Sequence, residues 1–567
     1  MKRIIITIFA LGLTLGANAQ MDNVVEVETT FKPTVQDAKK IDVLPQTEAT
    51  QIKHYDVDYS LSPNPTEQFV FQPANAEMSD AVIEGEPKGF FTIAGGNNCN
   101  LLTRGAYGLD LSPKSSLNFD LGLRGHIGDV DLFQDKDKTW RQRFYTTQGM
   151  VKFEHRLSPL SSLIIRADGE SQVYNYQHEK GSDDFDKQHN WIGGLDISVT
   201  PYTTGIFSVG GYARGKMFSR RCLLTPTTWM TGDEKYDQTQ HKWELGVVSD
   251  LTIDRQNKVG VDLHYQNAGW SDSDYTSLYA FDIIPHFTVD NEKTYMRLGA
   301  RLTFEKGTEL EYEGLGEYKV KSKFKAAPDV YMAFHLSPKV DLFGEATGGV
   351  VMNDFWLFQS LSPYWQMPYT QMPSAYNNIC AKAGFKWNII EGLFTKIYAG
   401  YDDTKNRAEV MFPEGKLYQN NIMVADGSLI HVNLEASYDY KDMISVKAKG
   451  RFNGWAINEH NGYFDDTPAW RPTVEAAAEV IYQPIKGLRL GVDYQFASFA
   501  EDDALTYKRP TTSNLGASVS YKLPESTHIK NMSIYAKLDN LLGKDYDWYY
   551  GHKAIGTTVL AGFAISF

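Results

Sequence analysis

The sequence has few cysteines, and beyond its first 15 residues it has no long apolar run. The three cysteines, Cys99, Cys222 and Cys380, lie far apart and are odd in number, so no disulfide framework is predicted. A helix that crosses a membrane needs about 18 or more apolar residues in succession. Because no such run follows residue 19, the sequence argues against a helical membrane protein.

The one long apolar run stands at the start of the chain and has the form of a secretory signal. Lys2 and Arg3 precede the run Ile4–Leu15, and Ala17-Asn18-Ala19 supplies a small-residue cleavage site before Gln20. We therefore expect residues 1–19 to be a signal peptide that exports the chain.

Basic residues are scarce relative to acidic ones. Without Lys2 and Arg3, 54 of the 56 basic residues remain against 70 acidic ones, a net charge of −16. Such a surface argues against nucleic acid as a partner. Two acidic loops, Asp129–Asp137 and Gly181–Asp186, resemble no known cation loop, so solvated charge is favoured over calcium binding at the lipopolysaccharide surface.

Enzyme motifs are also missing. The sequence contains no G-x-S-x-G, no H-E-x-x-H, no P-loop and no paired C-x-x-C, and its 13 histidines are scattered. We predict that the protein is not an enzyme, with no catalytic residues, no cofactor and no metal site.

Aromatic residues and period-two alternation are abundant. The chain has 33 Tyr, 30 Phe and 11 Trp at a mean hydropathy of −0.38, which fits strands that are apolar on one face only. The alternation is clear in residues 116–129, 296–305 and 488–496. The last stretch, Ile555–Phe567, places an apolar face at Ile555, Thr557, Val559, Ala561, Phe563, Ile565 and Phe567. An exposed face of this kind is suited to lipid.

The connections between these strands alternate in length. Ten short turns, from Ser112–Ser115 to Pro524–Lys530, separate longer polar links such as 130–142, 177–188, 217–238, 353–377, 407–428 and 458–469. This arrangement is typical of membrane barrels, with short periplasmic turns and long outer loops. We predict an all-β fold for residues 89–567, a single transmembrane up-and-down antiparallel β-barrel of about 22 strands, with 20 possible. The least certain strands are Gly89–Asn97, Cys99–Leu111 and the one containing Pro328.

Residues 20–88 differ from the barrel region. They hold six prolines, one glycine, and 13 acidic against five basic residues, without sustained alternation. We expect a mostly extended periplasmic segment with a possible partner in the periplasm.

One long link is unusually apolar. Residues 353–377 carry seven aromatic side chains, which makes free exposure to water unfavourable. This loop is predicted to fold into the lumen, to pack on other loops, or to form a ligand or partner surface, with packing favoured. The candidate residues are Phe355, Trp356, Phe358, Tyr364, Trp365, Tyr369 and Tyr376.

The C-terminal region resembles the closing signature of TonB-dependent receptor barrels. The match consists of the segment Leu538–Tyr546, reading LDNLLGKDY, and the phenylalanine-terminated strand. The residues that carry it are Asn540, Leu541, Leu542, Tyr546, Phe563, Ile565 and Phe567. The resemblance covers residues 89–567 through architecture, and only about the last thirty by motif. The signal peptide and the aromatic-rich strands look like those of the Bacteroidetes outer membrane.

The same resemblance draws attention to a short run near the mature N-terminus. The run is similar to a TonB box, and it consists of Val24, Val25, Glu26, Val27, Glu28 and Thr29. Receptors of this family carry a plug domain, whereas the 69 residues from Gln20 to Lys88 are too few and too proline-rich to resemble one. The resemblance implies a TonB-like periplasmic partner, while the missing plug argues against energised import.

Two functions are consistent with this sequence. The first is a plug-less, porin-like outer-membrane conduit or receptor for a small molecule or oligomer. The second is a scaffold or accessory subunit of a secretion, protein-insertion or surface-lipoprotein complex. Outer-membrane lipid and lipopolysaccharide would surround either one, and the sequence leaves the solute and the oligomeric state open.

Overall fold

The computed structural model describes most of the chain from residue 88 to the end. The described residues are 88–132, 137–177, 188–223, 235–271, 275–291, 293–311, 317–365, 371–388, 390–411, 420–441, 443–458, 468, 470–500, 508–524 and 531–567. All of them belong to one compact unit. The segment 20–87, with its TonB-box-like run Val24–Thr29, lies outside the described residues.

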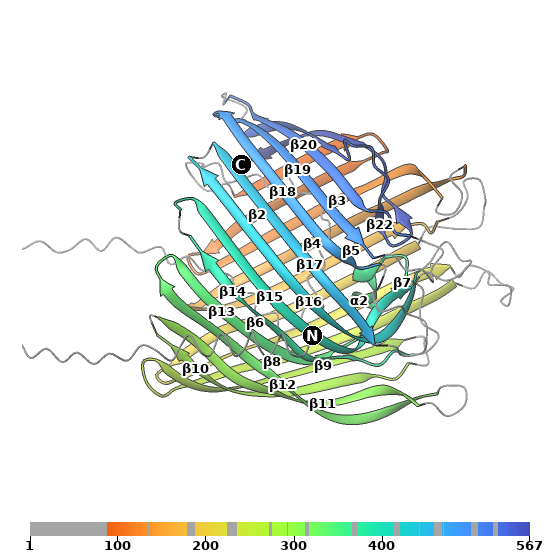
Figure 1. Ribbon diagram of the computed structural model, residues 1–567. Helices are drawn as coiled ribbons and strands as arrows, with labels where there is room; N and C mark the ends of the chain where they lie inside the picture. Colours follow the sequence, from red (N-terminus) through yellow and green to blue (C-terminus); the bar gives the residue numbers. More distant parts are fainter. Residues whose placement is uncertain are drawn as a thin grey trace, which may run out of the picture. The chain divides into compact units, whose positions relative to one another are not determined.

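Twenty-two strands form one antiparallel sheet, in which each strand pairs with its neighbours in sequence (Figure 1). The first half comprises β1 (Gly89–Gly96), β2 (Leu101–Ser112), β3 (Ser115–Asp131), β4 (Thr139–Ser158), β5 (Ser161–Tyr174), β6 (Gln188–Thr204), β7 (Phe207–Leu223), β8 (Lys235–Thr252), β9 (Asn257–Ser271), β10 (Leu278–Asp290) and β11 (Thr294–Glu311). The second half comprises β12 (Glu317–Ser337), β13 (Val340–Val351), β14 (Ala375–Trp387), β15 (Leu393–Met411), β16 (Asn421–Tyr440), β17 (Ile444–Asn458), β18 (Pro472–Ile485), β19 (Leu488–Phe499), β20 (Thr512–Lys522), β21 (Met532–Asp539) and β24 (Thr558–Ser566).

Two smaller elements lie outside this sheet. One is the short helix α2 (Phe355–Leu361), and the other is the hairpin of β22 (Asp547–Tyr549) and β23 (His552–Lys553). Among the described residues, no helix combines the length and the apolar character that crossing a membrane requires.

The sheet closes on itself through its first and last strands. β1 pairs with β24 from Phe90 opposite Ser566 to Gly96 opposite Leu560, and the N–H of Gly89 donates to the carbonyl of Phe567 at 2.9 Å. Closure leaves no free edge at this point. The expected barrel of 22 strands, including the β1–β2 pair at its start, is therefore confirmed.

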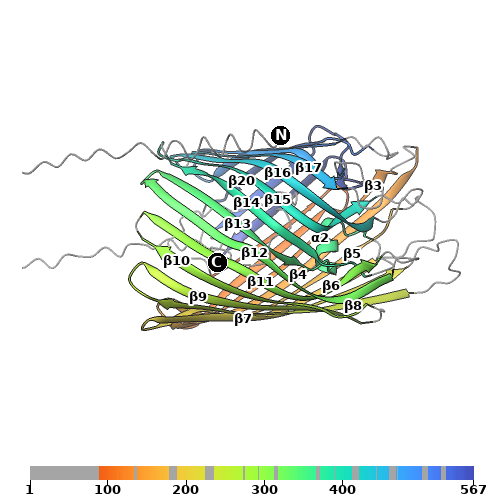
Figure 2. The same ribbon diagram turned by 60° about the horizontal axis from the view of Figure 1, so that its bottom comes forward.

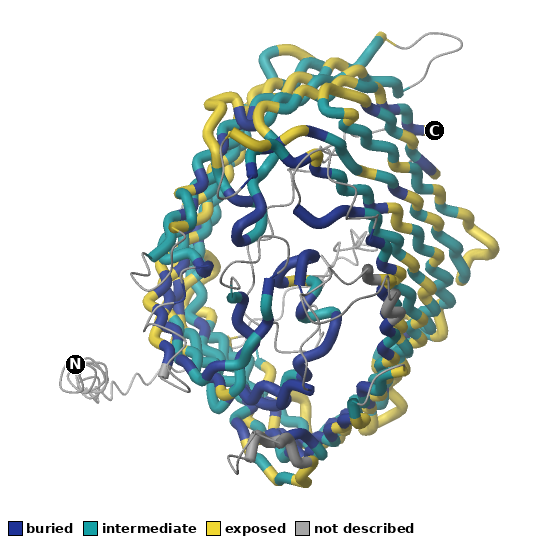
Figure 3. Tube along the Cα trace, turned by 90° about the vertical axis from the view of Figure 1, so that its right-hand side faces the viewer, coloured by how far each residue is buried: buried dark blue, intermediate teal, exposed yellow. Residues whose placement is uncertain are grey.

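The wall has an apolar outer face and a polar inner face. On β19 the side chains of Leu490 and Val492 are exposed, while Arg489 and Asp493 alternate with them on the other face. Figure 3 views the barrel along its axis and shows buried segments inside the ring of strands. An apolar exterior on a closed barrel is the arrangement that lipid requires, so these strands are transmembrane.

The two ends of the barrel differ as expected. Turns of a few residues, such as Pro113-Lys114 and Lys486-Gly487, join the strands at one end, and the longer links lie at the other (Figures 1 and 2). We call these the short-turn end and the long-loop end.

β12 runs through Pro328, where the sequence left the strand uncertain. Pro328 lies opposite Ala300 of β11, but pairing with β13 begins only at Asp329, opposite Thr347. Because proline has no N–H to donate, it is tolerated where a strand has no partner on one side. Residues 317–328 of β12 therefore pair with β11 alone.

Candidate functional site: the packed long-loop end of the lumen

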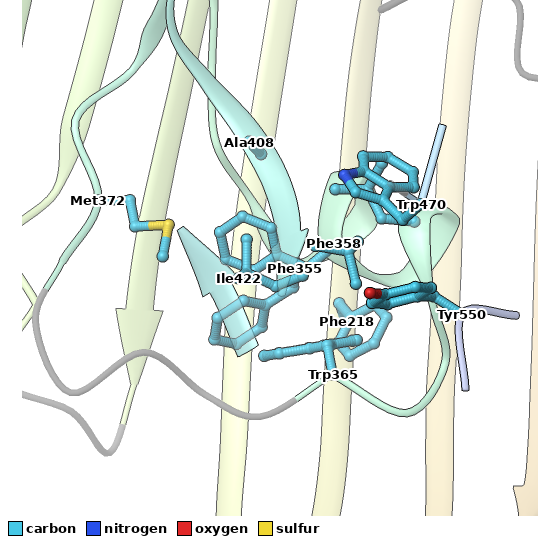
Figure 4. Packing of buried hydrophobic residues seen from close by; sticks show 11 residues of the cluster. Phe218, Phe355, Phe358, Trp365, Met372, Ala408, Ile422, Trp470 and Tyr550 are labelled. Carbon is cyan, nitrogen blue, oxygen red and sulfur yellow. The ribbon is translucent and has the colours of Figure 1, made fainter. Parts of the chain in front are cut away.

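Side chains from several distant segments pack together inside the barrel near its long-loop end. The main cluster joins α2 and Trp365 to wall residues of β7, β15 and β16 and to Trp470 and Tyr550 (Figure 4). Its buried members are Phe218, Phe355, Phe358, Leu361, Trp365, Met372, Ala408, Val410, Ile422, Trp470 and Tyr550. We take this packed region as the candidate functional site.

The helix α2 forms locally and presents one apolar face. Asp354 caps its N-terminus, because its Oδ1 accepts the N–H of Leu357 at 2.9 Å. Phe355, Phe358 and Leu361 follow at three-residue spacing, so they share the buried face. The helix ends just before Pro363, as expected, since the residue preceding a proline avoids the helical conformation.

The segment Met352–Trp365, which we call the lumen segment, reaches the opposite wall. It leaves β13 and contacts β8, β7, β6 and β5, which lie five to eight strands away around the sheet. Lys242 of β8 forms an ion pair with Asp354 at 3.0 Å, and the Phe355 N–H donates to Gln240 Oε1 at 2.7 Å. Only a segment that crosses the lumen can bridge strands so far apart.

The wall residues in these contacts face inward. On β8, Gln240 and Lys242 alternate with Trp243 and Leu245, which are 57% and 46% exposed on the outer face. Successive side chains of a strand point to opposite faces. The lumen segment is therefore bound to the polar inner surface of the barrel.

The amide of Gln359 connects α2 to two strands and to Trp365. Its Nε2 donates to Gln172 Oε1 of β5 at 2.6 Å, and its Oε1 accepts from Asn190 of β6 at 3.2 Å. The same Oε1 accepts the Trp365 indole N–H at 3.0 Å. The guanidinium of Arg220 lies 4.1 Å from the centre of the Trp365 ring, which fixes the far end of the segment.

A second aromatic cluster surrounds Tyr364. Its ring stacks on His552 of β23 at 3.8 Å between centroids and meets Trp140 and Tyr174 edge to face. Burial raises the pKa of Tyr364 well above 10, and that of its neighbour Tyr549 to about 12. The β22–β23 hairpin and the lumen segment thus pack against each other inside the barrel.

A buried carboxylate joins β15 to the segment before β18. Glu409 is fully buried and accepts from Arg407, from Arg471 at 2.8 Å and from the Trp470 indole at 2.9 Å. The Arg471 guanidinium also lies over the Trp470 and Trp455 rings. A carboxylate with three donors of this kind holds its neighbours in one geometry.

Charged residues on the remaining inner wall pair across strands. Arg297 of β11 donates to Asp262 of β9 at 2.7 Å and to Asp329 of β12 at 2.9 Å. His286 contacts Asp250 at 3.0 Å, two strands away. Pairs of mixed sign brace a wall rather than select an ion.

The aromatic loop residues predicted from the sequence are brought together here. Phe355, Phe358, Tyr364 and Trp365 are buried, and Trp356 is partly buried against the main cluster. Tyr376 belongs to β14 rather than to a loop, and its hydroxyl donates to the Ala326 carbonyl at 2.8 Å. Tyr369 lies outside the described residues.

The C-terminal signature residues take structural positions. Asn540 is buried in the left-handed region at φ 51°, and its side chain accepts the Lys544 N–H at 3.1 Å and donates to the Lys544 carbonyl at 2.9 Å. Leu541 and Leu542 are exposed, and burial raises the pKa of Tyr546. Phe563 and Phe567 are exposed on the outer face and Ile565 is half-buried, so this part of the motif forms the closing seam.

The wall residues that hold the lumen segment were not found from the sequence. Gln172, Arg220, Gln240, Lys242 and Glu409 look like other polar residues of amphipathic strands. Their shared role depends on a crossing of the lumen, for which the sequence carries no local signal. Within the described residues, no group of three or more His, Cys, Asp or Glu is arranged to hold a metal ion, and Cys99 and Cys380 are free.

No protein-family model and no curated protein matches the sequence. Several solved structures match its fold. The ferric yersiniabactin uptake receptor FyuA from Yersinia pestis superposes with a TM-score of 0.62 at 14% identity, over 85% of this chain and 80% of that one. The siderophore receptor PirA from Acinetobacter baumannii superposes with a TM-score of 0.61 at 9% identity, over 86% of this chain and 81% of that one. The copper transporter OprC superposes with a TM-score of 0.59 at 14% identity, over 84% of this chain and 80% of that one. The barrel architecture expected from the family resemblance is thus confirmed as a fold.

Proposed function

We propose that this protein is an outer-membrane conduit or receptor that moves a small molecule or oligomer through its lumen. In this proposal the packed lumen segment and the β22–β23 hairpin restrict passage at the long-loop end of the conduit. The structural neighbours are described as a copper transporter and siderophore receptors, which supports transport as the function of this barrel. We place the long-loop end outside the cell and the short turns in the periplasm, following the usual orientation of such barrels.

One observation carries the proposal. A barrel of this size encloses a water-filled lumen unless something occupies it, and here α2 and the β22–β23 hairpin pack across it (Figures 3 and 4). The contacts are specific: an ion pair, several side-chain hydrogen bonds and two aromatic clusters. A conduit that must not leak requires such a closure.

We further propose that residues 1–19 are an export signal and that residues 20–88 are a periplasmic segment rather than a full plug. The run Val24–Thr29 would then be the contact for a TonB-like or assembly partner. The composition of this segment, with six prolines and 13 acidic residues, supports the proposal.

The experiment is a flux assay on proteoliposomes with sugars of graded size. We compare the full chain with a variant that lacks residues 353–374. In this variant Met352 alone links β13 to β14. The deletion variant is expected to admit small sugars and the full chain to admit few. A folded deletion variant that admits none would overturn the proposal, and heat-modifiable migration on gels reports the folding of each barrel.

The scaffold hypothesis would be favoured by an exposed strand edge that invites a partner. Residues 320–325 of β12 do form such an edge, but Lys321, Lys323 and Lys325 occupy alternate positions along it. Lysines on an edge strand are the arrangement that prevents strand addition. The conduit is therefore the function we propose.

A further inference from the structure

Two neighbouring strands of the wall, β14 and β15, are bulged where they face each other. The strand register shifts between Thr347 and Gly349 in β13, between Asn377 and Ile379 in β14, and between Thr404 and Arg407 in β15. In the first two shifts the extra residue lies in β14, and in the third it lies in β15, so there are two bulges, and each bends the strand that carries it. Because Thr347 pairs with Cys380 and Asn377 with Thr404, the bulges lie side by side and form one crease.

Hydrogen bonds and backbone conformation fix the crease. Gly349 has φ +135° and Asn406 has φ +51°, conformations that most side chains disfavour. Asn378 donates to Asp403 at 2.8 Å, and the Asn406 N–H donates to Asp426 at 2.8 Å. The crease is therefore a defined bend in the sheet.

The strand ends between the crease and the long-loop end, which we describe as above the crease, are buried. The residues on the short-turn side, below the crease, form an ordinary half-exposed wall. Above it, Val350, Ala408, Val410 and Ile422 are between 2% and 4% exposed. We call the region above the crease the flap, comprising residues 349–365, 375–377, 407–411 and 420–426. The flap carries α2, which reaches across the lumen to β8.

One side edge of the flap lacks strand pairing and is held to the wall by side-chain contacts alone: the Tyr376 hydroxyl donates to the Ala326 carbonyl at 2.8 Å, and Val350 and Tyr376 share a buried cluster with Ala327. Pairing between β12 and β13 stops at Asp329 and Thr347, at the level of the crease. On the other side, β16 stays paired with β17 from Tyr440 to Asp426. A flap that lacks strand pairing along one edge, and whose backbone is attached through the crease and β16, has the connections of a hinged gate.

The tip of the flap is held by a buried ion pair. Lys242 Nζ lies 3.0 Å from Asp354 Oδ2 and 3.2 Å from Glu244 Oε1, with side-chain exposures of 12% for Lys242 and 4% for Asp354. The other carboxylate oxygen of Asp354 caps α2, so one side chain connects the helix to the wall. Loss of its charge would weaken both contacts.

We propose that the flap is a gate, hinged at the crease and latched to β8 by Asp354 and Lys242. Opening breaks this ion pair and swings α2 away from β5–β8, which clears the lumen at the long-loop end. This inference rests on the proposed conduit function and identifies the part that moves.

The test is single-channel recording of the full-length protein in planar bilayers. Asp354→Asn and Lys242→Gln each remove the attraction and are expected to raise the fraction of time open about tenfold or more, since hydrogen bonds to charged groups contribute about 1.5–3 kcal/mol. Lys242→Arg keeps the positive charge beside Asp354 and Glu244 and is expected to keep the open fraction near the wild-type value.

The matched control is Glu345→Gln, which breaks the Glu345–Lys382 pair below the crease on the same strands, at 3.0 Å. This variant is expected to behave like the wild type. Folded neutralising variants whose open fraction equals that of the wild type would overturn the gate, as would a Lys242→Arg variant that opens as much as they do. If even the variant lacking residues 353–374 never conducts, the conduit itself is wrong, so the two failures are distinguishable.

Discussion

At the scale of single residues, closure of the lumen depends on polar side chains buried beside aromatic ones. Three polar side chains each form hydrogen bonds to groups from separate segments: Gln359, Asn420 and Glu409. Removing any one of them would leave a wall or loop residue without that hydrogen-bond partner. Buried polar groups cost free energy unless they are paired. These residues therefore specify one arrangement of the loops.

Glu409 gives the sharpest prediction at this scale. Glu409→Gln leaves Arg407 and Arg471 buried without their carboxylate, and breaking a buried pair in this way costs about 3–5 kcal/mol. We expect the variant to unfold at a clearly lower temperature or denaturant concentration, as followed by tryptophan fluorescence in detergent. The control Glu479→Gln removes the exposed Lys447–Glu479 contact at 3.8 Å and should cost less than about 1 kcal/mol. Equal losses in the two variants would contradict the assignment.

The buried side chain of Tyr549 should make the stability of the folded protein depend on pH. Burial raises its pKa to about 12 in the folded protein, above the value of about 10 for an exposed tyrosine. The contribution of its neutral form is therefore complete below pH 10 and is lost as the pH rises through 12. Denaturant titrations at several pH values should show the wild type losing stability faster between pH 10 and 12 than Tyr549→Phe. Parallel losses in the two proteins would show that this phenol is not shielded.

At the scale of elements, the strands could be predicted and their bends could not. Period-two alternation in stretches such as 488–496 determines which face meets lipid, so strand number and turn positions followed from the sequence. The crease depends on single residues, Gly349 and Asn406, in strands that otherwise alternate normally. The aromatic run 353–377 indicated a packed loop, but not the wall strands it meets, because Lys242 and Gln172 lie more than 100 residues away in the sequence.

Gly349 tests the crease as an element. A side chain there would require an unfavourable φ of +135°, and its Cβ would lie 2.8 Å from the Arg301 side chain. Gly349→Val is expected to prevent the flap from folding inward, because strained conformations of this kind cost about 1–3 kcal/mol. Limited proteolysis should then cut the lumen segment faster than in the wild type. The control Gly450→Ala, in β17, meets no atom within 4 Å and should leave the cleavage rate unchanged. An uncut Gly349→Val variant would argue against the bend.

At the scale of the whole molecule, the barrel has to meet lipid outside, enclose water inside and close at its long-loop end. Its outer face exposes residues such as Leu121 and Val492 at 64% and 51%, which water would disfavour over so large a surface. The inner face carries the paired charges and the flap. The apolar outer face and the polar inner face both follow from the alternation of side chains along each strand.

Cysteine accessibility in proteoliposomes tests this arrangement most directly. With Cys99, Cys222 and Cys380 replaced by serine, single cysteines are introduced at Asp493, which faces the lumen, and at the adjacent Val492, which faces lipid. A charged, membrane-impermeant thiol reagent is predicted to label Asp493→Cys from the short-turn side but only slowly from the long-loop side, and to leave Val492→Cys nearly unlabelled. The lipid-facing wall would be contradicted if Val492→Cys were labelled as fast as Asp493→Cys. The restricted long-loop end would be contradicted if Asp493→Cys were labelled at equal rates from both sides.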